Sequence, residues 1–292
     1  MKATTKSSRI SLAGLIRNNP MMAEVRMANA RFVGGRGWSA GQIAAAAICV
    51  MLYLYFLVMV VQNSGSIEVS YLFLTMLVIM MVILPIALHG VIAGEREKRS
   101  LEMLLAAPVT STQIAMAKLM RAALFVAVVT VAFLIPILTV LVVQSVKGEI
   151  NGFPNMGVAF MAVGMSLVIT FFAALTNAAI SLAVSAAAKS TSAAMIANIG
   201  VHFFLLIFVP ILFTPVAAIS GDMASYLMLP HPIWAMSAFL YTNGQPMLNI
   251  NSLYGLVGIP IWLAISVFCF IFVVNSLDSD RRLGGRRKVK ES

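Results

Sequence analysis

Six stretches of the chain, each about twenty residues or longer, contain no Asp, Glu, Lys or Arg. A helix of about 20 apolar residues is long enough to cross the hydrocarbon core of a bilayer. With 61% hydrophobic and only 10% charged residues, the chain is too poor in charge for an ordinary soluble domain. The sequence therefore predicts an all-α polytopic membrane protein, with spans at about 40–61, 70–93, 122–146, 156–187, 192–219 and 251–275.

The basic residues fall into groups that alternate with the apolar stretches. Most of the 20 Lys and Arg residues precede residue 40, lie between 96 and 121, or follow 280. Cytoplasmic loops of membrane proteins carry such an excess of Lys and Arg. We therefore expect both ends of the chain on the cytoplasmic side, which requires an even number of crossings. Because no aromatic-interleaved basic face accompanies the charge, the net charge of +10 does not indicate nucleic-acid binding.

These patterns divide the chain into a cytoplasmic head (1–38), a six-span transmembrane domain (39–277) and a basic cytoplasmic tail (278–292). In the head, Asn19-Pro20 is a typical helix start, and the residues after it predict a short amphipathic helix on the membrane surface. The apolar segment 223–241 is short, and an extra crossing would break the even count. It either lies on the outer surface or dips into the membrane and returns, and the sequence leaves both open.

Motifs for enzymatic chemistry are missing from the sequence. There is no Gly-x-x-x-x-Gly-Lys-Ser/Thr loop for ATP phosphates and no His-Glu-x-x-His or Gly-x-Ser-x-Gly motif, so neither catalysis nor a bound cofactor or metal is expected. None of the six expected spans contains the Asp or Glu that usually marks ion coupling. Two alternatives to a transport subunit nevertheless stay open: an ion-coupled secondary transporter and a membrane-assembly protein that transports nothing.

Polar and small residues are densest in the fourth and fifth expected spans. Such residues let helices approach closely in lipid, so tight packing is one explanation for them. The other is that they line a path for substrate. The candidates for such a lining are Thr170, Asn177, Ser181, Asn198 and His202.

The only dense charge cluster between the two ends of the chain lies between the second and third expected spans. From Glu95 to Ala106, charged residues and leucines recur at helical spacing, which predicts one amphipathic helix at the membrane surface. Opposite charges four residues apart, as in Glu95 with Arg99, would form weak exposed pairs along it. Lys98 with Glu102 has the same spacing.

Residues just after this charged stretch predict a helix end and a new helix start. Pro108 cannot continue a helix, so it ends the amphipathic one. Thr110 and Gln113 have the spacing of a capping box, in which each side chain bonds the other's backbone N–H. The chain therefore re-enters the membrane through a helix that begins near residue 111.

The run Gly94-Glu95-Arg96-Glu97-x-x-Ser100-Leu101-Glu102-x-Leu104-Leu105-x-x-Pro108-Val109, with Lys118 ten residues later, resembles the signature of permease subunits of type-2 ATP-binding-cassette (ABC) exporters. Asn19-Pro20 resembles that family's interfacial start, and Ser185 to Ala194 resembles its turn between the fourth and fifth spans. The family usually has Gly where this chain has Arg99.

This resemblance implies an exporter permease in the plasma membrane of a bacterium or archaeon, with a coupling helix between the second and third spans. It also implies a separate ABC ATPase subunit, which binds the ATP, and a second permease copy or a sister permease alongside. It does not identify the substrate. The residues that the resemblance assigns to ATPase coupling, all within 94–118, are Glu95, Arg96, Glu97, Ser100, Leu101, Glu102, Leu104, Leu105 and Pro108.

Overall fold

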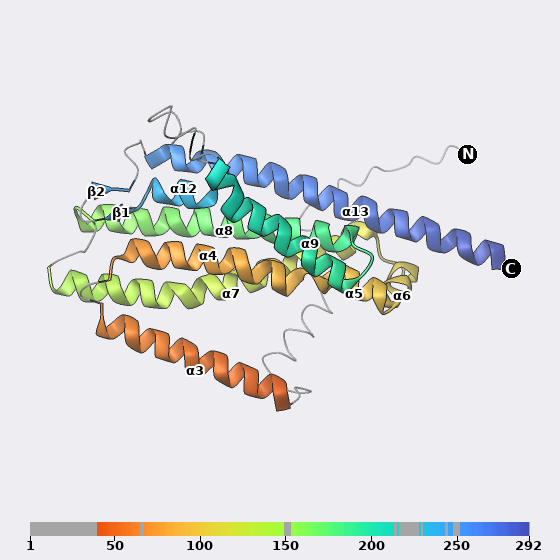
Figure 1. Ribbon diagram of the computed structural model, residues 1–292, viewed down its shortest axis with the longest axis horizontal. Helices are drawn as coiled ribbons and strands as arrows, with labels where there is room; N and C mark the ends of the chain where they lie inside the picture. The colour runs from red at the N-terminus through yellow and green to blue at the C-terminus, as the bar shows by residue number, and fades with distance from the viewer. Residues whose placement is uncertain are drawn as a thin grey trace, which may run out of the picture.

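Long helices that run roughly along one axis build the described part of the chain (Figure 1). The computed structural model describes residues 40–64, 67–148, 153–212, 215, 228, 230–242, 245–247 and 252–291. The predicted interfacial helix after Asn19-Pro20 lies outside these residues. The helices are α3 (Ala40–Gln62), α4 (Val69–Leu88), α5 (Gly90–Glu97), α6 (Ser100–Ala106), α7 (Ser111–Val146), α8 (Met156–Ala187), α9 (Thr191–Phe203), η1 (Phe204–Phe208), α12 (Pro232–Ser237), η2 (Ser252–Val257) and α13 (Gly258–Glu291).

Five helical stretches are long and apolar enough to cross a membrane, and they confirm an α-helical, multi-pass membrane protein. They are Val69–Glu97, Ser111–Val146, Met156–Ala187, Thr191–Leu212 and Tyr254–Arg282. The first expected span, 40–61, coincides with α3, whose part Val50–Gln62 is a shorter apolar helix. The count of six spans therefore stays a prediction.

Helix α8 lies at the centre of the bundle and packs against α4, α5, α7, α9, α12 and α13. Its buried face is rich in Ala and Ser, which lets so many helices approach one another closely. Helix α3 lies at the edge and packs against α7. There the Tyr53 hydroxyl donates to the Ala132 carbonyl at 2.5 Å, and the Phe56 and Phe133 rings lie 6.1 Å apart.

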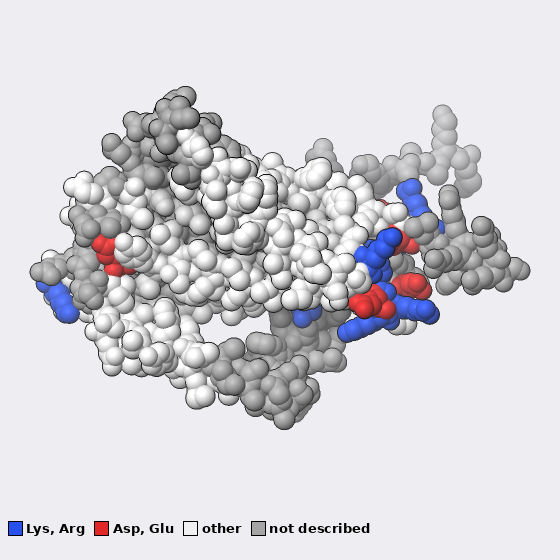
Figure 2. Space-filling model, viewed as in Figure 1, with Lys and Arg blue, Asp and Glu red and all other residues white. Residues whose placement is uncertain are grey.

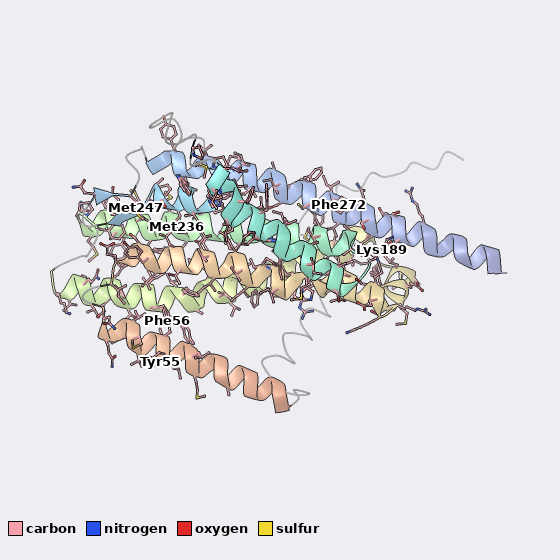
Figure 3. All side chains as sticks on the ribbon, viewed as in Figure 1. Tyr55, Phe56, Lys189, Met236, Met247 and Phe272 are labelled. Carbon is pink, nitrogen blue, oxygen red and sulfur yellow. The ribbon has the colours of Figure 1, made fainter. Side chains whose placement is uncertain are left out.

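The two ends of the bundle differ in charge (Figure 2). One end, called the charged end below, holds α5, α6, the α8–α9 turn with Lys189 (Figure 3) and the part of α13 near Asp280. A smaller group of charges lies at the opposite end, where the connections from α3 to α4 and from α7 to α8 are found. The charged segments, which alternate with apolar ones along the sequence, thus lie at the ends of the bundle, and the larger group lies at one end.

The described part of the segment 223–241 is packed into the bundle at the opposite end. Helix α12 has its proline at the first helical position, where no backbone N–H is needed. The side chains that follow join the main apolar core and are at most 3% exposed: Ala235, Met236 (Figure 3), Ala238, Phe239 and Leu240. A two-residue antiparallel pair, β1 (Tyr241–Thr242) with β2 (Gln245–Pro246), continues from it. Where this segment lies relative to the membrane stays a prediction.

Candidate functional site

The charged stretch forms two short helices, so the prediction of one continuous helix from Glu95 to Ala106 is wrong. Helix α5 ends at Glu97, and α6 begins at Ser100. Between them Arg99 takes the left-handed conformation, with φ 59° and ψ 8°. A helix cannot continue through a residue in that conformation, so α6 leaves in a new direction. Helix α6 ends at Ala106, close to Pro108 as expected, and the capping box of Thr110 with Gln113 is confirmed at the start of α7.

The left-handed backbone at Arg99 explains why the resembling family usually has Gly at this position. An L residue with a side chain costs about 1–2 kcal/mol in the left-handed region, whereas Gly adopts it readily. Among the described non-glycine residues, Arg99 is the only one with positive φ. Its side chain is exposed at the charged end.

We therefore expect Arg99→Gly to stabilise the protein by about 1 kcal/mol, because it removes backbone strain at little loss of contact. Arg99→Val should destabilise it, since β-branched residues tolerate positive φ poorly. Thermal unfolding of the purified full-length chain in detergent checks both variants. A lower unfolding midpoint for Arg99→Gly than for the parent protein would contradict this explanation.

Glu95 points back to the third span. Its carboxylate lies 2.7 Å from the Lys118 ammonium group on α7, which also donates to the Val91 carbonyl at 3.0 Å. The expected pair of Glu95 with Arg99 is therefore wrong, because the left-handed turn breaks the helical spacing between the two. The same break separates Lys98 from Glu102. Glu95 and Lys118 instead fix α5 to α7.

Arg96 joins α5 to the end of α8 and to α13. One guanidinium nitrogen, Nη2, lies 2.6 Å from the Asp280 carboxylate and donates to the Ala186 carbonyl at 2.9 Å. The other, Nη1, donates to the Ala188 carbonyl. The last carbonyls of a helix have no partner within it, so Arg96 satisfies groups that α8 leaves open. The planar guanidinium suits this multiple contact better than a lysine would.

Glu97 joins α5 to the start of α9. Its carboxylate accepts from the Thr191 backbone N–H at 3.0 Å and from the Thr191 hydroxyl at 2.6 Å. A negative charge is favourable there, because the N-terminus of a helix has free N–H groups and a partial positive charge. Gly90 permits the close approach, since a Cβ there would lie 3.3 Å from the Thr191 side chain, a tight contact.

Ser185 makes a further link between α8 and α5. Its hydroxyl donates to the His89 carbonyl at 2.6 Å and accepts from the backbone N–H groups of Ile92 and Ala93, both at 3.1 Å. The Ile92 N–H belongs to the first turn of α5, where no helical acceptor exists. Ser185 and Thr191 lie in the stretch that resembles the family's turn. Asp280, by contrast, carries no sequence signal that identifies it as the partner of Arg96.

Helix α6 has one buried face and one exposed face. Leu101 is 2% exposed and Leu105 9%, and both pack with Ile92, Val273 and Leu277. Leu104 is half-buried against the same cluster, and Ser100 donates to the Glu95 carbonyl at 3.2 Å. On the other side Met103 is 73% exposed. The exposed residues of α6 and of the turn before it form one surface, called the outward face below. It consists of Lys98, Arg99, Glu102 and Met103, with Ala106 and Pro108 at its edge.

The five candidate lining residues are buried between helices of the bundle. Thr170, Ser181 and Asn198 are 0% exposed, and Asn177 and His202 are 4% exposed. Asn198 donates to the Ser181 carbonyl at 3.3 Å, and the His202 ring lies 2.8 Å from the Asn198 carbonyl. The first of these contacts ties α8 to α9, and the second lies within α9. A role in lining a substrate path stays a prediction.

The charged end thus joins one short segment to four spans through three consecutive side chains, an arrangement suited to transmitting movement. Among the described residues, no group of three or more His, Cys, Asp or Glu is placed to hold a metal ion.

The family model described as "ABC-2 family transporter protein" matches residues 15–270. The chain belongs to this family. A comparison with curated proteins found no match.

Membership of the ABC-2 family defines the general role of the chain. An ABC-2 family protein is a membrane component of a transport system and is not itself catalytic. The family also implies an ABC ATPase as partner.

Proposed function

We propose that this chain is the permease subunit of an ATP-driven exporter and that it receives force from its ATPase through residues 94–118. The observation that supports this most directly is the division of contacts among three consecutive residues. Glu95 holds α7, Arg96 holds α8 and α13, and Glu97 holds α9. A displacement of α5 would therefore act on four spans together.

In this proposal the charged end faces the cytoplasm, as the excess of Lys and Arg there favours. The chain has six spans with both termini on that side, and it pairs with a second copy or a sister permease in the plasma membrane. ATP is bound by the ATPase alone. The substrate passes between the spans, with the polar residues of α8 and α9 as the candidate lining.

The contacts support a division of the nine coupling candidates into two groups. Seven make contacts within the bundle and are called the inward group, although Glu97 is itself exposed: Glu95, Arg96, Glu97, Ser100, Leu101, Leu104 and Leu105. The outward face has Glu102 and Met103 at its centre and Pro108 at its edge. We assign docking of the ATPase to the outward face and transmission of force to the inward group.

A Glu97→Lys variant tests this assignment. The lysine cannot accept the two hydrogen bonds from Thr191, and it places a positive charge at the start of α9, where such a charge is unfavourable. We expect the variant to copurify with the ATPase but to lose ATP-driven transport and the accompanying change in ATP hydrolysis. The measurement is the ATPase rate of the complex in liposomes, relative to that of the isolated ATPase.

Glu97→Gln is the matched control, because its amide oxygen still accepts from Thr191. The expected order of coupling is parent, then Gln, then Lys. Coupling that survives the lysine unchanged would remove Glu97 from the force path. Failure of the parent chain to copurify with any ATPase would overturn the proposed function itself.

A further inference from the structure

The fifth span changes its hydrogen-bonding register in its outer half. Residues 204–208 form the π-helix η1, and the Val209 backbone N–H bonds the Phe204 carbonyl, five residues back. The next residue is Pro210, which has no N–H. The Leu205 carbonyl therefore loses its α-helical donor, residue 209, and its π-helical donor, residue 210. An unpaired carbonyl away from water costs free energy, so another donor is needed.

The side chain of His231 occupies the position of this missing donor. Its ring nitrogen Nε2 lies 3.2 Å from the Leu205 carbonyl oxygen. In the tautomer with a proton on Nε2, the ring donates a hydrogen bond to that oxygen. His231 is 8% exposed, and its ring stands edge-on to Trp234 at a centroid distance of 6.1 Å. The contact joins two segments 26 positions apart in the sequence.

The segment that carries His231 is firmly seated in the bundle. The Trp262 indole N–H on α13 donates to the Pro230 carbonyl at 2.8 Å, and the Ser70 hydroxyl on α4 donates to the Tyr241 carbonyl at 2.6 Å. At Gly255 the backbones approach so closely that an added Cβ would lie 2.6 Å from the Ala235 carbonyl oxygen. By contrast, none of the five residues of η1 is buried. His231 therefore connects a buried segment to one whose side chains are exposed or half-buried.

We propose that His231 is a latch that holds the outer half of the fifth span, residues 204–212, against residues 230–242. The π-helix η1 and Pro210 form the hinge that this latch controls. π-Helical turns and prolines are the usual places where a long helix bends. With the latch closed, the outer half stays against the segment that carries His231; with it open, that half swings about η1. The proposal is independent of how ATP drives the protein, because the hinge and the latch both lie within this chain.

Hydrogen exchange of backbone amides in the full-length chain, reconstituted in lipid nanodiscs, tests the latch. His231→Phe keeps a ring of similar shape but has no N–H to donate. We expect peptides that cover 204–212 to exchange about fivefold faster in this variant, a change typical of one lost hydrogen bond. His231→Gln should exchange like the parent protein, because its amide N–H reaches the same carbonyl. His89→Leu is the matched control, since in the described part of the chain the His89 ring bonds one nearby carbonyl, that of Ile86 at 2.6 Å, at the charged end.

A second substitution distinguishes loss of the His231 hydrogen bond from a change in side-chain packing. Pro210→Ala returns an N–H to the fifth span, so Leu205 regains a donor and the effect of His231→Phe should largely disappear in the double variant. If His231→Phe alone does not fold, the double variant should fold and exchange like Pro210→Ala. The latch is overturned if His231→Phe leaves exchange at 204–212 unchanged, if Gln is as disruptive as Phe, or if Pro210→Ala gives no rescue.

Discussion

An Arg96→Met variant is expected to lose most of its ATP-driven transport while it still binds the ATPase. The substitution removes the guanidinium that joins the Ala186 and Ala188 carbonyls to the Asp280 carboxylate. Hydrogen bonds to a charged group are worth about 1.5–3 kcal/mol each. The two charged side chains are 24% and 29% exposed, so solvent screening reduces this value, and we expect a loss of about 2 kcal/mol in the free energy of unfolding.

The decisive readout for Arg96→Met is the ATPase rate of the complex in liposomes, measured beside thermal unfolding of the chain. Arg96→Lys should be intermediate, because one ammonium group cannot reproduce the planar contact. Arg282→Met removes the same charge from an exposed position on α13 and should behave like the parent protein. If Arg96→Met is as well coupled as Arg282→Met, then α5 does not transmit force to α8 and α13.

A Met103→Asp variant is expected to weaken the complex with the ATPase by at least about tenfold, without loss of stability in the chain itself. Met103 is 73% exposed, so in this chain it buries little that a charge would disrupt. In a complex, burial of a Met side chain contributes about 1.5–3 kcal/mol, which corresponds to about ten- to a hundredfold in affinity. The affinity is measured by the amount of ATPase that copurifies as the detergent concentration of the washes increases. The stability is measured by thermal unfolding of the chain alone.

Two variants of the same helix sharpen this comparison. Met103→Leu keeps an apolar side chain and should bind the ATPase like the parent protein. Leu101→Asp places a charge at a position 2% exposed and should instead destabilise the chain. Equal ATPase binding by Met103→Asp and Met103→Leu would show that the outward face does not contact the partner.

Much of the fold could be predicted because local rules were sufficient for it. Helix α8 (Met156–Ala187) has the bounds expected for the fourth span, and the capping box at Thr110 starts α7. Length, apolar composition and cap residues act within a single segment, so no neighbouring segment has to be known. The third span is expected to begin only at 122, after the charged residues Lys118 and Arg121. Helix α7 begins at Ser111, and the side chain of Lys118 lies against Glu95 within the bundle.

The sequence predicts where the candidate site lies but not which of its residues contact one another. Charges at helical spacing predicted local pairs, whereas the pairs found depend on how distant segments pack. Arg96 and Asp280 are separated by 184 positions, and Glu97 and Thr191 by 94. The turn at Arg99 was missed for a different reason, since an arginine rarely adopts positive φ. Its only signal was the Gly usual in the resembling family.

The most direct test of the proposed coupling role places a photo-crosslinking amino acid at position 103 and, as a control, at position 146. Both positions are highly exposed, at 73% and 83%, but they lie at opposite ends of the bundle. Irradiation of intact membranes and mass spectrometry of the products then identify what lies beside each position. We predict that position 103 crosslinks to an ATPase with a phosphate-binding loop and position 146 does not. An ATPase that copurifies with the chain but crosslinks from 146, or from neither position, would contradict docking at α5 and α6.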